Sequence, residues 1–99
     1  MSKPLSDIDV PPIANSNPEA KEVLRVWAAP GAPLQLTLRT FWKDPRAWGL
    51  LLADIARHAA QACERKGGDR DDVLRRIEES FKAEWAYPTD QPEDLSDIV

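Results

Sequence analysis

The stretch of sequence that decides the fold is EVLRVWAAPGAPLQLTLRT, residues 22–40. Apolar and polar side chains alternate on both sides of a connection, residues 29–33, that contains proline and glycine. Alternation with a period of two is typical of β-strands. A short connection with these residues is typical of a hairpin turn. The sequence therefore predicts antiparallel strands over residues 22–28 and 34–41.

The hairpin has one register that brings its leucine-type side chains together. Pairing Val26 with Leu36 places Leu24 opposite Leu38, and all four then share one face. A slip by one residue would move one strand's apolar set to the opposite face. We therefore expect this register.

A helix over residues 45–66 follows the hairpin. Asp44 provides an N-cap acceptor and Pro45 suits the first helical position. The helix is expected to end at Gly67–Gly68, because glycine accepts the left-handed conformation that closes many helices.

A second helix over residues 70–86 begins after the cap residue Asp69. The short link makes the two helices an antiparallel pair. The predicted fold is α+β with the order ββαα, an antiparallel β-hairpin packed on an antiparallel helix pair.

The helix over residues 45–66 is apolar around most of its circumference. A two-stranded sheet cannot cover so wide an arc, so we expect this helix to be buried on more than one side. Gly49 lowers its helix propensity, and a close approach by Trp42 or a strand would explain that glycine.

Prolines and charges divide the 99-residue chain into three parts. We expect a flexible N-terminal tail over residues 1–20, a single domain over 21–87 and an acidic C-terminal tail over 88–99. The net charge of −4 divides into −2, +2 and −4 over these parts. An acidic chain is not expected to bind nucleic acid.

The chain contains one cysteine and one histidine. These counts exclude an intrachain disulfide and a metal site built from several Cys or His ligands of one chain. We therefore predict no metal and no cofactor. No stretch approaches 18 apolar residues, so no membrane span is expected. The N-terminus lacks the apolar run of a signal peptide, which favours a cytoplasmic protein.

A domain of about 67 residues without disulfides or a bound metal has a small core. The two strands of an isolated hairpin are also both edges. We therefore predict a homodimer. Either the hairpins pair edge to edge and extend the sheet, or the first helix packs against its symmetry mate.

The outer face of the hairpin carries Arg25, Trp27 and Arg39. An indole flanked by guanidinium groups can bind a small anion or an acidic peptide by stacking and bidentate bonds. This face could equally hold the protein's own acidic tail. The favoured interpretation is structural, with Trp27 packed under the N-terminal segment or at a dimer interface.

A polar stripe on the first helix contains Asp54, Arg57 and His58. Asp54 and His58 are one turn apart, so they could form an ion pair or half of a metal site. A solvated surface pair is the favoured interpretation, and no catalytic residue is predicted.

Two strings carry a family resemblance, EVLRVW over residues 22–27 and WGLLLADIARH over residues 48–58. They resemble a family of small, uncharacterised proteobacterial proteins that is defined as a domain of unknown function. The resemblance covers about residues 18–66 and implies a bacterial cytoplasmic setting without an assigned activity. The second string includes the polar stripe.

Three functional hypotheses remain from the sequence. The favoured one is a non-enzymatic homodimer that acts through protein–protein contacts. The alternative is a binding module for a small anionic ligand or an acidic peptide on the face of Arg25, Trp27 and Arg39. The third is an enzyme or metal protein centred on Asp54, Arg57 and His58 and assembled across a dimer.

Overall fold

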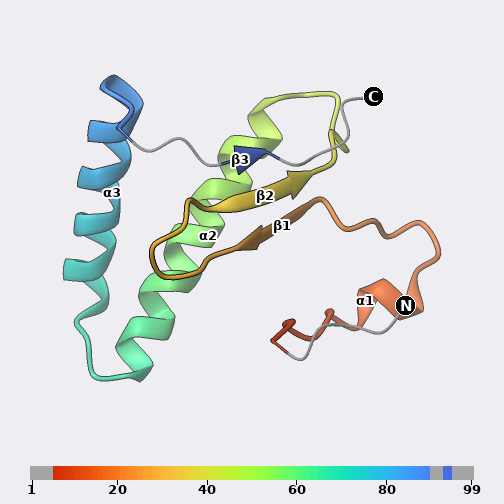
Figure 1. Ribbon diagram of the computed structural model, residues 1–99. Coiled ribbons are helices and arrows are strands. Elements are labelled where there is room, and N and C mark those ends of the chain that lie inside the picture. Colours follow the sequence, from red (N-terminus) through yellow and green to blue (C-terminus); the bar gives the residue numbers. More distant parts are fainter. Residues whose placement is uncertain (1–5, 90–92, 95–99) are drawn as a thin grey trace.

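The structure is a computed structural model that describes residues 6–89 and 93–94. The elements in chain order are α1 (Ile13–Ser16), β1 (Leu24–Trp27), β2 (Gln35–Leu38), α2 (Arg46–Arg65), α3 (Arg70–Ala86) and β3 (Glu93–Asp94). The hairpin of β1 and β2 lies across α2, and α3 runs beside them (Figure 1). The predicted α+β class, a hairpin followed by a helix pair, is confirmed.

The hairpin has the register that its side-chain pattern predicts. Val26 pairs with Leu36 and Leu24 pairs with Leu38. The N–H of Arg39 donates to the carbonyl of Val23 over 2.9 Å, which extends the ladder by one residue beyond β1. The predicted pairing is therefore confirmed.

A tight turn closes the hairpin between β1 and β2. The N–H of Ala32 donates to the carbonyl of Ala29 over 3.2 Å. Pro30 supplies the second position and Gly31 the third, with a φ of 76°. These features define a type II turn, in which only glycine or asparagine readily occupies the third position.

Helix α2 is closed at both ends by its own chain. Asp44 Oδ1 accepts the N–H of Arg46 over 3.0 Å, as expected of a cap residue. At the other end Gly67 has a φ of 98°. The N–H groups of Gly67 and Gly68 donate to the carbonyls of Glu64 and Cys63. This pair of bonds is a Schellman motif, and the predicted left-handed glycine is confirmed.

Helix α3 begins at the cap that the sequence predicts. Asp69 accepts from the backbone N–H groups of Asp71 and Asp72, over 3.0 and 3.2 Å. Along the exposed face, the Arg75 guanidinium lies 2.6 Å from the carboxylates of both Asp72 and Glu79. Pairs at these spacings support the helix from its surface.

Short elements lie within both segments that the sequence predicts as tails. Helix α1 forms one turn after two prolines, which suit the start of a helix. Strand β3 pairs in parallel with β2, with Glu93 opposite Gln35 and Asp94 opposite Leu36. Residues 1–5, 90–92 and 95–99 of the predicted tails lie outside the described residues.

Little of the described chain is fully enclosed. Ala60, on α2, is the one buried hydrophobic side chain among the described residues. Leu52 and Ile55, also on α2, remain 44% and 43% exposed. The expectation that this helix is buried on more than one side is therefore wrong for a single chain, because the hairpin and α3 cover only part of its circumference.

An aromatic cluster connects the end of the hairpin to the start of α2. Trp42 packs edge-on against Trp48, with ring centroids 5.3 Å apart, and Phe41 packs edge-on against Trp42. Edge-to-face contacts of this kind add to the energy of burial. They hold the first turns of α2 beside the chain that leaves β2.

Candidate functional site

Arg25 is the centre of the predicted binding face, and its guanidinium already has partners. Its Nε and one terminal nitrogen donate to the two carboxylate oxygens of Glu22, over 3.1 and 3.0 Å. The Asp7 carboxylate lies 3.8 Å from the other terminal nitrogen. Two acidic side chains of the same protein therefore occupy the position that an anion was predicted to take.

These partners stabilise the charged form of Arg25. The hydrogen bond that Arg25 donates to Glu22 is the main cause, and together with the charges of Glu22 and Asp7 it raises the pKa of Arg25 above its ordinary value. An arginine is charged at any physiological pH. The acidic partners therefore affect the orientation of the guanidinium and not its charge.

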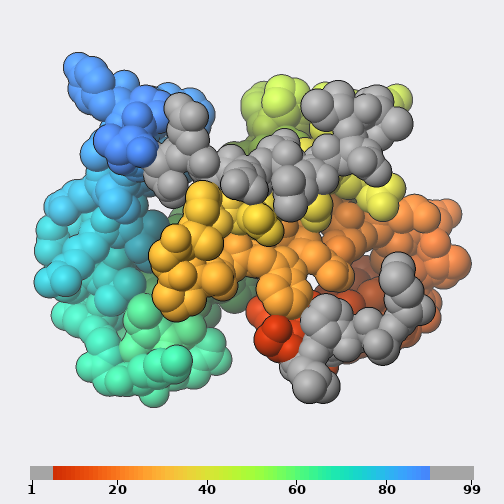
Figure 2. All heavy atoms as spheres, in the orientation of Figure 1, coloured from red at the N-terminus to blue at the C-terminus, as the bar shows by residue number. Residues whose placement is uncertain are grey.

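The first described residues lie along β1. Residues 6–11, Glu22 and residues 24–28 line a groove of about 430 Å³. The Asp7 side chain is only 16% exposed there. Figure 2 shows these residues, in red, directly against the orange hairpin. The predicted alternative, in which an acidic segment of the protein itself lies on this face, therefore has a direct contact in its favour.

The other two residues of the predicted site are close to the same contacts. Arg39 Nε donates to the backbone carbonyl of Glu22 over 3.3 Å. Trp27 lines the groove and is 37% exposed. Glu22 thus links Arg25 to Arg39, and Trp27 flanks the groove beside residues 6–11.

Sequence reasoning identified the arginines and the tryptophan but missed the acidic partners. Glu22 lies three positions before Arg25, which would have been a signal only on a helix. Asp7 is 18 positions away, and only its charge connected it to this face. Their roles follow from how the N-terminal segment runs past β1.

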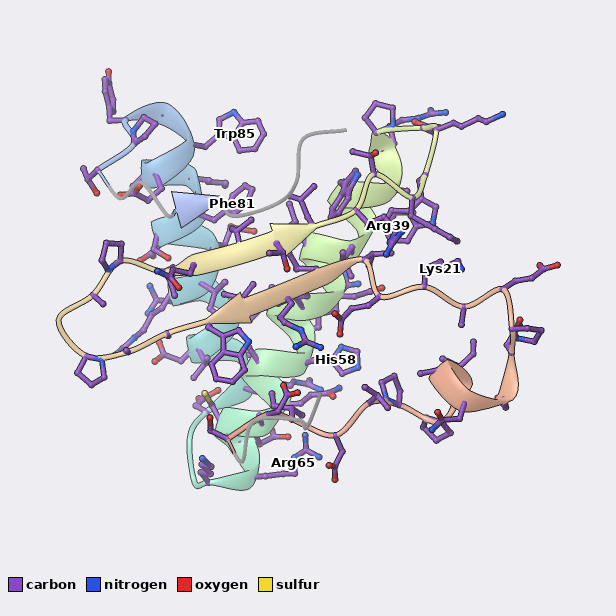
Figure 3. The ribbon with its side chains drawn as sticks, turned by 45° about the vertical axis from the view of Figure 1, so that its right-hand side comes forward. Lys21, Arg39, His58, Arg65, Phe81 and Trp85 are labelled. Atoms are coloured by element: carbon purple, nitrogen blue, oxygen red, sulfur yellow. The ribbon has the colours of Figure 1, made fainter. Side chains whose placement is uncertain are left out.

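Asp54 and His58, in the polar stripe of α2, do not form an ion pair with each other. His58 Nδ1 lies 2.7 Å from the backbone carbonyl of Asp54, so the ring bonds to the helix backbone rather than to the carboxylate. Asp54, Arg57 and His58 are all exposed. His58 projects from the side of α2 away from α3 (Figure 3). Over residues 6–89 and 93–94, no three side chains of His, Cys, Asp or Glu gather as metal ligands.

A second feature of the surface is its exposed apolar side chains. On the helices, the exposed fractions are 71% for Leu50, 47% for Phe81 and 76% for Trp85. The rings of Phe81 and Trp85 are stacked, with centroids 5.5 Å apart. Isolated exposed hydrophobic residues are ordinary, whereas these two rings are adjacent and form one exposed apolar patch.

None of the described helices combines the length and the hydropathy needed to cross a bilayer.

The structure thus defines a small α+β domain with an acidic segment on its β1 side and apolar side chains on its helices. The chain belongs to the family described as Domain of unknown function (DUF5076), whose model matches residues 7–89. The predicted resemblance to an uncharacterised domain family is confirmed, over a longer part of the chain than expected.

A solved structure shares this fold over nearly its whole length. It is a protein of the photosynthetic bacterium Rhodopseudomonas palustrus CGA009, provisionally described as a pyruvate dehydrogenase. It is 37% identical, with a TM-score of 0.76, and the match covers 100% of this chain and 99% of that one. Among curated proteins, none shows significant similarity to this chain.

Proposed function

We propose that this protein is a non-enzymatic homodimer that acts through protein–protein contacts, in a bacterial cytoplasmic setting. The observation that carries the proposal is the size of its accessible surface, 8953 Å². A compact monomer of 11.1 kDa exposes about 5,700 Å². Obligate homodimer interfaces bury about 2,000–5,000 Å² in total, so the excess is of the size that dimerisation removes.

The dimensions of the chain support the same proposal. Its radius of gyration is 15.5 Å, whereas a compact chain of this length has about 13 Å. Part of the difference comes from the N-terminal segment, where residues 8–19 are all exposed. The helices also have incompletely covered apolar side chains, such as Leu50 and Trp85, which a second chain would cover.

Sedimentation equilibrium of the full chain at tens of micromolar tests the proposal. The expected mass is twice the 11.1 kDa of one chain. Affinity capture from the native bacterium then identifies the proteins that the dimer contacts. A mass of one chain at that concentration would contradict the proposal.

A second candidate is the binding of acidic peptides on the face of Arg25, Trp27 and Arg39. The contact between Asp7 and Arg25 favours it, since it shows a carboxylate of an extended segment held at this place. In this proposal residues 6–11 compete with the ligand, so binding requires Asp7 to leave Arg25.

Tryptophan fluorescence tests this candidate with inorganic phosphate and an acidic peptide as probes. Asp7→Asn should increase the affinity for the peptide, because it removes the competing charge, and Arg25→Ala should abolish binding. Glu19→Gln is the matched control, because Glu19 is an exposed acidic residue of the same segment outside the groove. The absence of any fluorescence change with either probe would contradict the candidate without affecting the proposed dimer.

The activity named for the structural relative is a statement about that protein. It identifies no residue of this chain, and so it adds no argument to either proposal.

A further inference from the structure

We propose that a second copy of this chain docks on an apolar surface formed by the C-terminal half of α3 and the N-terminal half of α2. Phe81 and Trp85 of each copy would pack against this surface on the other. The inference rests on the proposed homodimer and names the surface through which it forms.

The apolar stripe of α3 becomes steadily more exposed toward its C-terminal end. Val73, Leu74 and Ile77, near the link to α2, are half-buried. Phe81 and Trp85 continue the stripe and are 47% and 76% exposed. The far half of this stripe is therefore incompletely covered.

The arrangement of the helices explains this gradient. The two helices meet at the Gly67–Gly68 link and diverge away from it, as Figures 1 and 3 both show. In Figure 3, the rings of Phe81 and Trp85 lie on the side of α3 that faces the sheet and α2. Figure 2 shows the C-terminal end of α3, in blue, projecting beyond the body.

Small residues on α2 show the same gradient. Gly49, Ala53, Ala56 and Ala60 follow one another at spacings of four, three and four, which places them on one side of the helix. Ala60 is fully buried and Ala56 is half-buried, whereas Ala53 and Gly49 are exposed. A Cβ added to Gly49 would meet no atom within 4 Å.

This surface thus combines large and small side chains. α3 contributes a stacked pair of aromatic rings, and α2 contributes positions with little or no side chain. Rings pack well over such positions, because large groups opposite small ones interdigitate. Aromatic residues also carry much of the binding energy at interfaces.

A second copy is the occupant that fits this surface best. Each copy offers the same rings and the same small residues, so a two-fold axis makes both contacts at once. The excess accessible surface of a single chain is large enough for such an interface. A close approach by the partner would also explain Gly49, which is unfavourable in a helix and which nothing within one chain requires.

The first test replaces Trp85 and measures dimerisation by sedimentation equilibrium. Trp85→Ala should raise the dimer dissociation constant at least about ten-fold, as removal of a central aromatic anchor does. Ile8→Ala is the matched control, because Ile8 is 87% exposed but lies on the N-terminal segment. Circular dichroism of the full chain checks that each variant remains folded.

The second test adds bulk instead of removing it. Gly49→Leu leaves one chain undisturbed, since a Cβ at this position meets no atom within 4 Å. The leucine side chain should obstruct the rings of the partner and weaken the dimer to a similar extent. Ala83→Leu is the matched control, an exposed alanine away from the apolar stripe of α3.

The possible outcomes separate the two proposals. If the unaltered chain is a dimer and both Trp85→Ala and Gly49→Leu weaken it while the controls do not, the surface is established. If the chain is a dimer whose dissociation constant neither variant changes, this surface is wrong and the homodimer stands. If the unaltered chain is a monomer, both proposals are wrong.

Discussion

Carboxylates define where both long helices of this protein begin. Asp44 and Asp69 each accept backbone N–H groups that have no partner within the helix. Four such groups are present at the start of any α-helix, and a side-chain oxygen is their usual partner. These aspartates therefore determine the first turns of α2 and α3.

Replacement of the α3 cap tests this role. Asp69→Ala removes the acceptor of two N–H groups and should lower the free energy of unfolding by about 1 kcal/mol. The measurement is urea denaturation followed by circular dichroism. Asp69→Ser is the control, because serine also caps helices and should retain most of the stability. Equal losses in both variants would contradict a capping role.

Arginine pairs make the stability of the fold depend on pH. The hydrogen bond from Arg46 lowers the pKa of Asp44 below its ordinary value of 3.8, and the hydrogen bond from Arg75 does the same for Asp72. A carboxylate with a lowered pKa stabilises the folded state above the unfolded-state pKa. That contribution is lost as the pH falls through the folded-state pKa.

We therefore expect the urea midpoint to decrease as the pH falls below about 4, the ordinary range of aspartate. Asp72→Asn should flatten this decrease, because asparagine does not titrate. The two side chains are exposed, so the effect should be small and should diminish at high salt. Parallel pH profiles for the original chain and the variant would show that the pair does not contribute.

At the scale of elements, two glycines with positive φ determine how consecutive elements connect. Gly31 closes the turn between β1 and β2, and Gly67 ends α2 so that α3 can return beside it. Both conformations are costly for a residue with a Cβ. The hairpin and the helix pair therefore each depend on one glycine.

The Gly67→Ala variant tests the connection between the helices. The change should destabilise the protein by about 1 kcal/mol, since alanine must adopt the left-handed conformation. Gly67→Asn should be tolerated better, because asparagine is the second most common residue at this position. Thermal unfolding of the two variants provides the comparison, and a fully stable Gly67→Ala would contradict the assigned role.

At the scale of the whole molecule, the elements are well formed locally but incompletely covered. The hairpin is closed by its ladder and each helix by its caps, whereas Ala60 is the one buried hydrophobic side chain of the described residues. Small domains bury a limited fraction of their surface. The incomplete cover is therefore a property of the whole molecule, and the proposed dimer would reduce it.

The proposed dimer predicts that stability depends on protein concentration. When folding and dimerisation are linked, the midpoint of thermal unfolding rises as the concentration increases from about 5 to about 200 μM. A monomer would unfold at the same temperature throughout this range. Trp85→Ala should lower the midpoint most at the lowest concentration, where association is weakest.

The sequence by itself determined the features that arise from neighbouring residues. Alternation specified the pairing of Val26 with Leu36, and the cap at Asp69 and the left-handed Gly67 were also readable. These features depend on interactions within a few positions or on a two-residue period. A single sequence displays both directly.

Only the tertiary structure decided how the elements lie relative to one another. It brought Asp7 to Arg25, placed β3 beside β2 and separated the ends of α2 and α3 that carry Gly49 and Trp85. Each of these placements depends on the path of the chain between distant residues. The pattern of apolar residues shows that a helix face must be covered, but the path of the chain decides which element covers it and which part stays exposed.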